Sequence, residues 1–191
     1  MKITDMDIIR RYGACRQSGF TLVEMLTTLT VMITVLATGI PAMQRFLANQ
    51  EMITSINRVA SHLHLARSEA IKRGLRAVLC PSSDGENCLK SMQWQQGFIL
   101  FADENANKKR DASEALLRQY HSNKKVPQIH ITTTDGRRWV RYQSSGEAGG
   151  SNLTMTFCDT NHFIEPKAII ISNTGRPRVS TSKPNGEPLD C

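Results

Sequence analysis

The chain of 191 residues lacks the features of an enzyme. Its five histidines are scattered, no glycine-rich loop precedes a predicted helix, and no serine or cysteine lies in a recognisable nucleophile elbow. Internal repeats and long low-complexity segments are also absent, which excludes a repeat architecture. We therefore expect no catalytic residue, no cofactor and no metal site.

Charge is missing from one long segment. Met25–Gln44 contains twenty residues without a charged side chain, and about 20 residues of helix cross a hydrocarbon core. Glu24 lies at the edge of this run. An ionised side chain at bilayer depth costs at least about 2.5–3.5 kcal/mol unless it finds a partner. The segment therefore predicts a membrane-spanning helix and a cation that pairs with Glu24.

A short basic segment precedes the apolar run. Residues 1–19 contain four basic and two acidic side chains, a net charge of +2. The positive-inside rule keeps this segment cytoplasmic and places the C-terminal bulk of the chain outside. The small residues Ser18 and Gly19 lie before the run, whereas a secretory signal has its cleavage site after the run. The apolar helix should therefore remain in the mature protein.

Gly19-Phe20-Thr21-Leu22-Val23-Glu24, with Pro41 further along, resembles the N-terminus of type IV pilins and pseudopilins. The resemblance implies that a prepilin peptidase cleaves after Gly19 and methylates the new N-terminal Phe20. It also implies that Glu24 pairs with the N-terminal ammonium of a neighbouring subunit, and that Pro41 kinks the helix. The alternative is an uncleaved, single-span anchor.

Cysteines are few, and Cys15 lies in the leader. The other four allow three pairings. Cys80 and Cys88 flank a turn-rich stretch that can close locally, and Cys158 would then pair with Cys191 and hold the C-terminus against a strand. Disulfides fit an exported domain. A zinc site is the weaker alternative, because the gap between Cys80 and Cys88 exceeds the usual ligand spacing.

Hydrophobic periodicity predicts one long helix followed by short strands. Residues 47–73 carry an apolar stripe that should pack on a sheet, and Gly74 should end the helix. The stripe contains Met52, Ile56, Val59, Leu63, Ala66 and Ala70. His62 and His64 point to different faces of this helix and should not chelate a metal.

Turn residues separate seven apolar segments beyond the helix. These expected strands are 76–80, 97–101, 116–121, 129–134, 139–143, 153–158 and 168–172. Short strands after a single helix predict an α+β fold, with antiparallel sheet packed on the helix. Together with the N-terminal resemblance, this order implies the pilin fold.

The predicted organisation has three parts. Residues 1–19 are a leader, 20–46 a transmembrane and filament-core helix, and 47–191 a periplasmic domain in which helix 47–73 precedes a β-rich part, 75–191. The chain would lie in the inner membrane with one span, and later in a pilus at the cell surface. After cleavage it keeps 20 basic and 15 acidic residues, a net charge of +5, which favours anionic partners.

The C-terminal part, Leu153–Cys158 and residues 168–179, resembles the GspH/FimT branch of minor pilins and pseudopilins. The shared features are an isoleucine-rich strand and the turn Gly175-Arg176-Pro177-Arg178. One subgroup of this branch, the minor pilins of natural transformation, binds DNA through the two arginines of this turn. The resemblance therefore implies that Arg176 and Arg178 contact double-stranded DNA during its uptake.

The residue types suit this interpretation. In an extended stretch Arg176 and Arg178 project to the same side, and two guanidiniums can contact successive phosphates irrespective of sequence. Aromatic residues are sparse near the tail, which argues against sequence-specific reading of single strands. Further basic candidates are Lys183, a second cluster of Arg137, Arg138 and Arg141, and a third of Lys108, Lys109 and Arg110.

An assembly role without DNA binding is the alternative. In that case the chain is a minor pilin that primes pilus growth, or a minor pseudopilin of type II secretion. The basic turn would then be solvated or would contact a neighbouring pilin.

Overall fold

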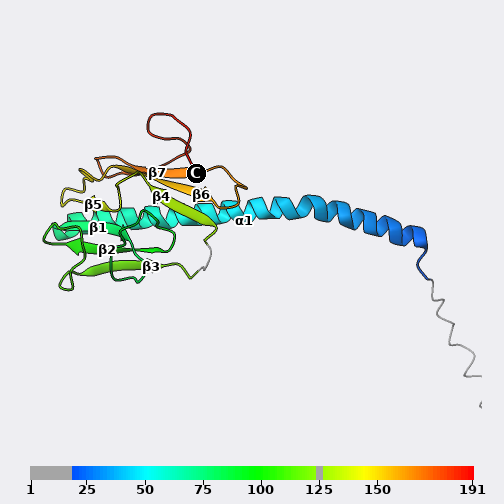
Figure 1. Ribbon diagram of the computed structural model, residues 1–191, viewed down its shortest axis with the longest axis horizontal. Helices are drawn as coiled ribbons and strands as arrows, with labels where there is room; N and C mark the ends of the chain where they lie inside the picture. The colour runs from blue at the N-terminus through cyan, green and yellow to red at the C-terminus, as the bar shows by residue number, and fades with distance from the viewer. Residues whose placement is uncertain (1–18, 124–126) are drawn as a thin grey trace, which may run out of the picture. The chain divides into compact units, whose positions relative to one another are not determined.

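The computed structural model describes residues 19–123 and 127–191. The chain divides into two compact units, Met1–Ala42 and Met43–Cys191, and each is described by itself. In the described part of the chain, helix α1 spans Leu22–Arg73 and is followed by eight strands (Figure 1). The strands are β1 (Arg76–Pro81), β2 (Gly97–Asp103), β3 (Leu116–His121), β4 (Ile129–Thr133), β5 (Val140–Tyr142), β6 (Leu153–Asp159), β7 (Lys167–Ile171) and β8 (Pro177–Ser180).

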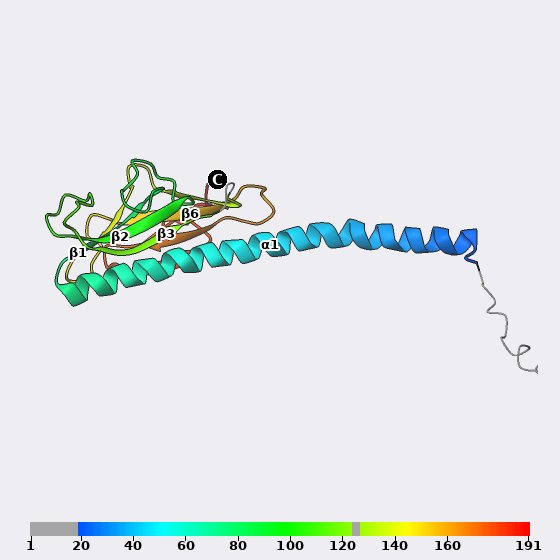
Figure 2. The same ribbon diagram turned by 90° about the horizontal axis from the view of Figure 1, so that it is seen from below.

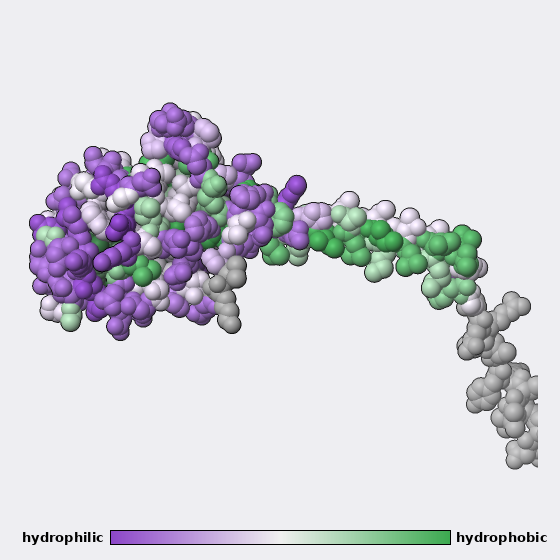
Figure 3. Space-filling view, in the orientation of Figure 1, coloured by the Kyte–Doolittle hydropathy of each residue, from purple (hydrophilic) through white to green (hydrophobic). Residues whose placement is uncertain are grey.

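The first part of α1 is an exposed apolar helix (Figure 3). The Thr21 hydroxyl accepts the Glu24 N–H at 3.2 Å and so caps the helix. Further along, threonine hydroxyls donate to carbonyls of the preceding turn, so these polar groups are satisfied within the helix itself. An 18-residue window of α1 has a mean hydropathy of 1.7, so by length and composition the helix could cross a membrane.

The second part of α1 packs on the β-rich part of its unit. All six residues of the predicted apolar stripe are buried, and Ala48 and Ser55 extend the buried face. The helix ends at Arg73, and the Gly74 N–H donates to the Ile71 carbonyl at 3.3 Å. Both the stripe and the helix end are therefore confirmed.

Two four-stranded antiparallel sheets face this helix segment (Figure 2). Sheet A has the strand order β3-β2-β1-β5, and sheet B has the order β4-β6-β7-β8. One apolar core joins the helix to both sheets through residues such as Leu63, Phe98 and Ile169. The predicted α+β fold is thus confirmed.

A second apolar cluster covers the outer face of sheet A. It contains Val78, Cys80, Ile99 and Phe101, against which Cys88, Leu116 and Trp139 pack. Apolar side chains therefore cover both faces of sheet A, which explains why every residue of β2 is buried.

The expected strands agree with the structure apart from one or two residues at some ends, with one addition. Residues 177–180, which the sequence analysis treated as a turn and its continuation, form β8 and pair with β7. Proline suits the first residue of an edge strand because it has no N–H to donate. Pro177 therefore opens β8 instead of preventing it.

The cysteines form two disulfides in the pairing that the sequence analysis expected. Cys80 and Cys88 close a short loop, with their Cα atoms 5.6 Å apart. Cys158 and Cys191 join β6 to the end of the chain, with a Cα separation of 5.7 Å.

Candidate nucleic-acid interface

The turn before β8 is held in place by a close backbone contact. Gly175 has a φ of +75°, and a Cβ atom there would lie 2.3 Å from the Gly146 carbonyl oxygen. Such a contact is sterically forbidden, so only glycine fits without a shift of the backbone. Next to it, the Ala148 N–H donates to the Asn173 carbonyl at 2.9 Å. The turn is therefore fixed on the loop 143–151.

Arg176 and Arg178 follow this turn, and both are exposed. Arg178 lies in β8 opposite Ile170 of β7, at the edge of sheet B. Its position is set by strand pairing on one side and by the Gly175 turn on the other. The two guanidiniums are thus presented to solvent from a backbone that is held in place.

Arg178 also borders a groove of about 920 Å³ on the outer face of sheet B. Threonines of β4 and β6, among them Thr132, Thr154 and Thr156, line it, and residues 183–185 of the C-terminal tail form another part of its lining. The Cys158–Cys191 disulfide attaches that tail to β6. The groove is therefore lined by both polar and apolar side chains and has a covalently anchored border.

Lys183 is paired within the tail. Its ammonium group donates to Asp190 and lies 4.0 Å from Glu187 Oε2. The hydrogen bond to Asp190 raises the pKa of Lys183 above its ordinary value. A phosphate would have to compete with these two carboxylates, so Lys183 is a weaker candidate than its position in the sequence indicated.

Arg137 and Arg138 lie between β4 and β5, at the same end of sheet B as the Gly175 turn. The Arg137 guanidinium donates to the Gly150 carbonyl at 2.6 Å, and Arg138 is exposed. Gly150 belongs to the loop 143–151 on which the Gly175 turn rests. The structure therefore connects two arginine groups that are almost 40 residues apart in the sequence.

Arg141 is separated from that group. It lies in β5 opposite Val78, on the outer face of sheet A. Its guanidinium carbon is 5.9 Å from the centre of the Trp139 ring, and Lys108 Nζ is 4.4 Å from the same ring centre. Sequence reasoning missed Trp139, although its spacing of two residues from Arg141 places both on one face of an extended strand.

The remaining predicted site residues lie at the start of α1. Gly19 and Phe20 precede the helix, Glu24 lies in its first turn, and all three are exposed. Cleavage, methylation and pairing of Glu24 involve other proteins and stay predictions. The part of the predicted leader before Gly19 lies outside the described residues.

Two crystal structures of the type IV minor pilin FimU from Pseudomonas aeruginosa strain PAO1 resemble this structure. One matches with a TM-score of 0.52 and 16% identity, over 66% of this chain and 90% of that chain. The other matches with a TM-score of 0.54 and 17% identity, over 71% and 92% of the two chains. The long helix packed on antiparallel sheets is therefore the type IV pilin fold.

A family model described as Type II transport protein GspH matches residues 55–175. The chain belongs to the GspH family, the minor pilins and pseudopilins of type IV pili and type II secretion. These are structural proteins that assemble with other pilins, and the apolar N-terminal helix is of the length and composition of a membrane anchor. No curated protein matches the chain.

Proposed function

We propose that this minor pilin binds double-stranded DNA without sequence preference and supports DNA uptake in natural transformation. The observation that carries the proposal is the exposure of Arg176 and Arg178 on an edge strand that the Gly175 turn holds in place. Uptake of arbitrary DNA requires contacts that ignore sequence, and contacts to phosphates meet this requirement.

The charge at this end of sheet B supports the proposal. Arg137, Arg138, Arg176 and Arg178 lie there together with two acidic residues, Asp135 and Glu147. The local balance is therefore positive. Arginine also suits the role, because its planar guanidinium can donate two parallel hydrogen bonds to one phosphate.

The acidic tail indicates how the duplex approaches. Glu187 and Asp190 neutralise Lys183, which lines the groove together with Arg178. The carboxylates of Glu187 and Asp190 repel phosphates, so we place the duplex against Arg176 and Arg178 and outside the groove. Arg137 and Arg138 would extend the contact, whereas Lys183 and Arg141 would contribute less.

The proposal includes processing and assembly. Prepilin peptidase cleaves after Gly19, Phe20 is methylated, and Glu24 pairs with the new ammonium group of another subunit. Residues 20–46 first span the inner membrane and then join the filament core, while residues 47–191 form the periplasmic domain. Neutralisation by that ammonium removes the cost of a carboxylate at bilayer depth.

DNA binding can be measured with the full-length protein in detergent and a fluorescent duplex, across a series of salt concentrations. The double variant Arg176→Gln/Arg178→Gln should bind at least about tenfold more weakly, and its log–log salt dependence should be shallower by about 0.9 for each lost phosphate contact. A matched control, Lys90→Gln/Arg118→Gln, removes the same charge from exposed positions on the sheet A side. Equal affinity in the two double variants would refute the turn as the contact site.

A second candidate function is assembly without DNA binding. Val179 of β8 is 57% exposed beside Arg178, and an exposed apolar residue on an edge strand suits contact with a neighbouring subunit. This function predicts no DNA binding by the wild type at low salt. It also predicts that Val179→Ser lowers incorporation into pili.

A further inference from the structure

The loop between β2 and β3 has the spacing of a calcium-binding loop. Over the twelve residues Asp103–Glu114, side chains with oxygen atoms occupy positions 1, 3, 5, 9 and 12. They are Asp103, Asn105, Asn107, Asp111 and Glu114. An EF-hand loop takes its ligands from these positions and from the main-chain carbonyl of position 7, here Lys109.

The backbone of the loop has the matching conformation at position 6. EF-hand loops have an invariant glycine there for a sharp turn. In this chain position 6 is Lys108, and its φ of 64° lies in the left-handed region that glycine normally occupies. The turn is therefore present although the glycine is not.

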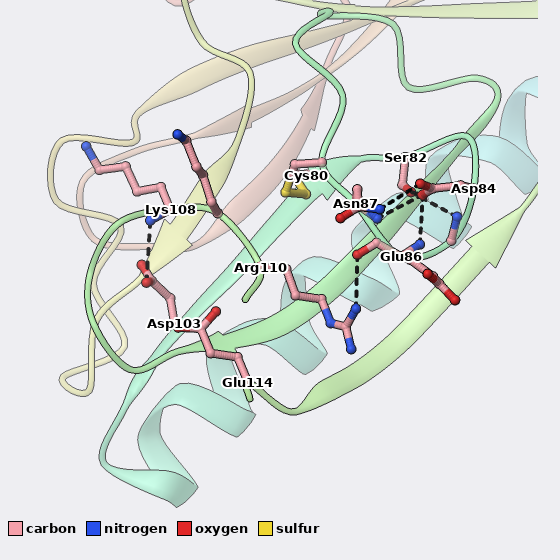
Figure 4. Close-up of a disulfide and its surroundings, with 12 residues drawn as sticks. Cys80, Ser82, Asp84, Glu86, Asn87, Asp103, Lys108, Arg110 and Glu114 are labelled. Atoms are coloured by element: carbon pink, nitrogen blue, oxygen red, sulfur yellow. Dashed lines mark hydrogen bonds between the residues drawn. A yellow bond between two sulfur atoms is a disulfide. The ribbon is translucent and has the colours of Figure 1, made fainter. Parts of the chain in front are cut away.

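Hydrogen bonds within the loop draw the oxygen-bearing side chains together, and Figure 4 shows the one that joins Lys108 to Asp103. The Lys108 N–H donates to Asp103 Oδ1 at 3.4 Å, and the Asp111 N–H donates to Glu114 Oε2 at 3.0 Å. The side-chain amides of Asn105 and Asn107 both donate to Asp111 Oδ2, at 2.6 and 2.8 Å. Rotation of these amides would direct their oxygens inward in place of their N–H groups.

An independent observation points to a cation. Asp103 is 0% exposed, and its Oδ2 atom has no hydrogen-bond partner among the described residues. Glu114 is also buried, at 4% exposure. A buried carboxylate oxygen without a partner is costly, and a bound cation would remove that cost. Asp103 Oδ1 accepts a hydrogen bond from the loop, so this carboxylate faces the loop.

The basic residues of the loop point elsewhere. Lys108 Nζ lies over the Trp139 ring, and the Arg110 guanidinium donates to the Glu86 carbonyl at 3.2 Å (Figure 4). Lys109 is exposed. The run Lys108-Lys109-Arg110, which the sequence analysis grouped as a basic cluster, therefore does not occupy the interior of the loop.

We propose that the loop Asp103–Glu114 binds a calcium ion through its three carboxylates, the two asparagine oxygens and the Lys109 carbonyl. In the described part of the chain no three Asp, Glu, His or Cys side chains already converge as metal ligands. The carboxylates and amides therefore rotate inward on binding. Calcium tolerates such a flexible set of oxygen ligands, whereas magnesium demands near-ideal octahedral geometry.

The proposal departs from the sequence expectation of no metal site. Three nearby basic side chains weaken the attraction for a cation, so the expected Kd is about 10⁻⁴–10⁻³ M, the range of extracellular modules.

The test is calorimetric titration of the chelator-treated, full-length protein in detergent with calcium chloride, and separately with magnesium chloride. The wild type should bind about one calcium ion per chain with a Kd in that range, and its Tm should rise in about 10 mM calcium. Absence of both signals would refute the proposal. An equal response to magnesium would also refute it, because it would indicate a non-specific ionic effect.

A matched pair of variants lies within the loop itself. Glu104→Gln and Glu114→Gln remove the same charge, but Glu104 occupies position 2 and is exposed. Glu114→Gln should weaken calcium binding by at least about tenfold, whereas Glu104→Gln should change it by less than about threefold. Glu114 also accepts two N–H groups, so Asp111→Asn serves as a second ligand variant with the same expected loss. Wild-type affinity in both ligand variants would overturn the assignment.

Discussion

The outer faces of the two sheets differ in how the chain covers them. On sheet A, side chains such as Phe101 and Ile99 are buried in a cluster that Cys88, Leu116 and Trp139 complete. On sheet B, half-buried threonines border an open groove, and an anchored tail lies along its edge. Sheet A is therefore covered by the chain itself, whereas sheet B retains a surface for contact with other molecules.

The largest expected effect is a difference in stability loss when a side chain is truncated to alanine on one outer face or on the other. Phe101→Ala removes a fully buried ring from the outer face of sheet A and should lower the free energy of unfolding by about 3–5 kcal/mol. Thr154→Ala, on the outer face of sheet B, should cost less than about 1 kcal/mol. Denaturant unfolding of both variants measures this contrast, and similar losses would show that sheet B is covered as well.

The two disulfides should stabilise their regions unequally. The loop-closure model predicts about 4 kcal/mol for Cys158–Cys191 and about 2.5 kcal/mol for Cys80–Cys88, because the sequence separations are 33 and 8 residues. Each contribution is measured by unfolding with and without reductant in a variant whose other cysteine pair is replaced by alanine. This design cancels the packing effect of the replacement. A larger contribution from Cys80–Cys88 would contradict the entropic explanation.

Local patterns predicted most of the fold. The stripe from Met52 to Ala70, the end of α1 before Gly74 and the short apolar strands depend on neighbours along the chain, which the sequence displays directly. β8 was missed because Pro177 resembles a turn residue, and only pairing with β7 makes it a strand.

Contacts beyond the range of local patterns explain what the sequence could not show at the candidate site. Arg137 reaches Gly150, Lys183 is paired with Asp190, and Lys108 lies on Trp139. None of these contacts follows a periodic pattern. The spacing of the oxygen-bearing side chains in Asp103–Glu114 is visible in the sequence, whereas the outward direction of Lys108 and Arg110 depends on contacts with Trp139 and Glu86.

The turn that supports Arg176 and Arg178 should tolerate no side chain. Gly175→Ala combines an unfavourable positive φ with a clash against Gly146, and should cost about 2–4 kcal/mol. Gly186→Ala in the tail has a similar φ, but its added Cβ meets nothing within 4 Å, so its cost should be about 1–2 kcal/mol. The difference between the stability losses of the two variants gives the cost of the clash with Gly146. Equal costs would show that the turn is not held against the loop 143–151.

The smallest expected effect is a difference in how pH changes the stability contributions of Asp84 and Lys183, one near each disulfide. Hydrogen bonds from the Asn87 backbone, the Asn87 side chain and the Glu86 N–H lower the pKa of Asp84 (Figure 4). Its contribution to stability is therefore present above the unfolded pKa of about 3.9 and is lost as the pH falls through the lower folded value. Asp190 raises the pKa of Lys183. The contribution of Lys183 to stability is therefore present below its unfolded pKa and is lost as the pH rises through its folded pKa.

Asp84→Asn should accordingly flatten the acid limb of a stability–pH curve, and Lys183→Gln the alkaline limb. Thermal unfolding between about pH 2 and 11 measures both limbs, a range that brackets the unfolded pKa values of Asp and Lys. Both groups are accessible to solvent. The Lys183 effect depends on an ion pair, whereas the Asp84 effect depends on hydrogen bonds from neutral donors. Salt should therefore reduce the Lys183 effect more than the Asp84 effect. Equal salt sensitivity of the two limbs would contradict this assignment of causes.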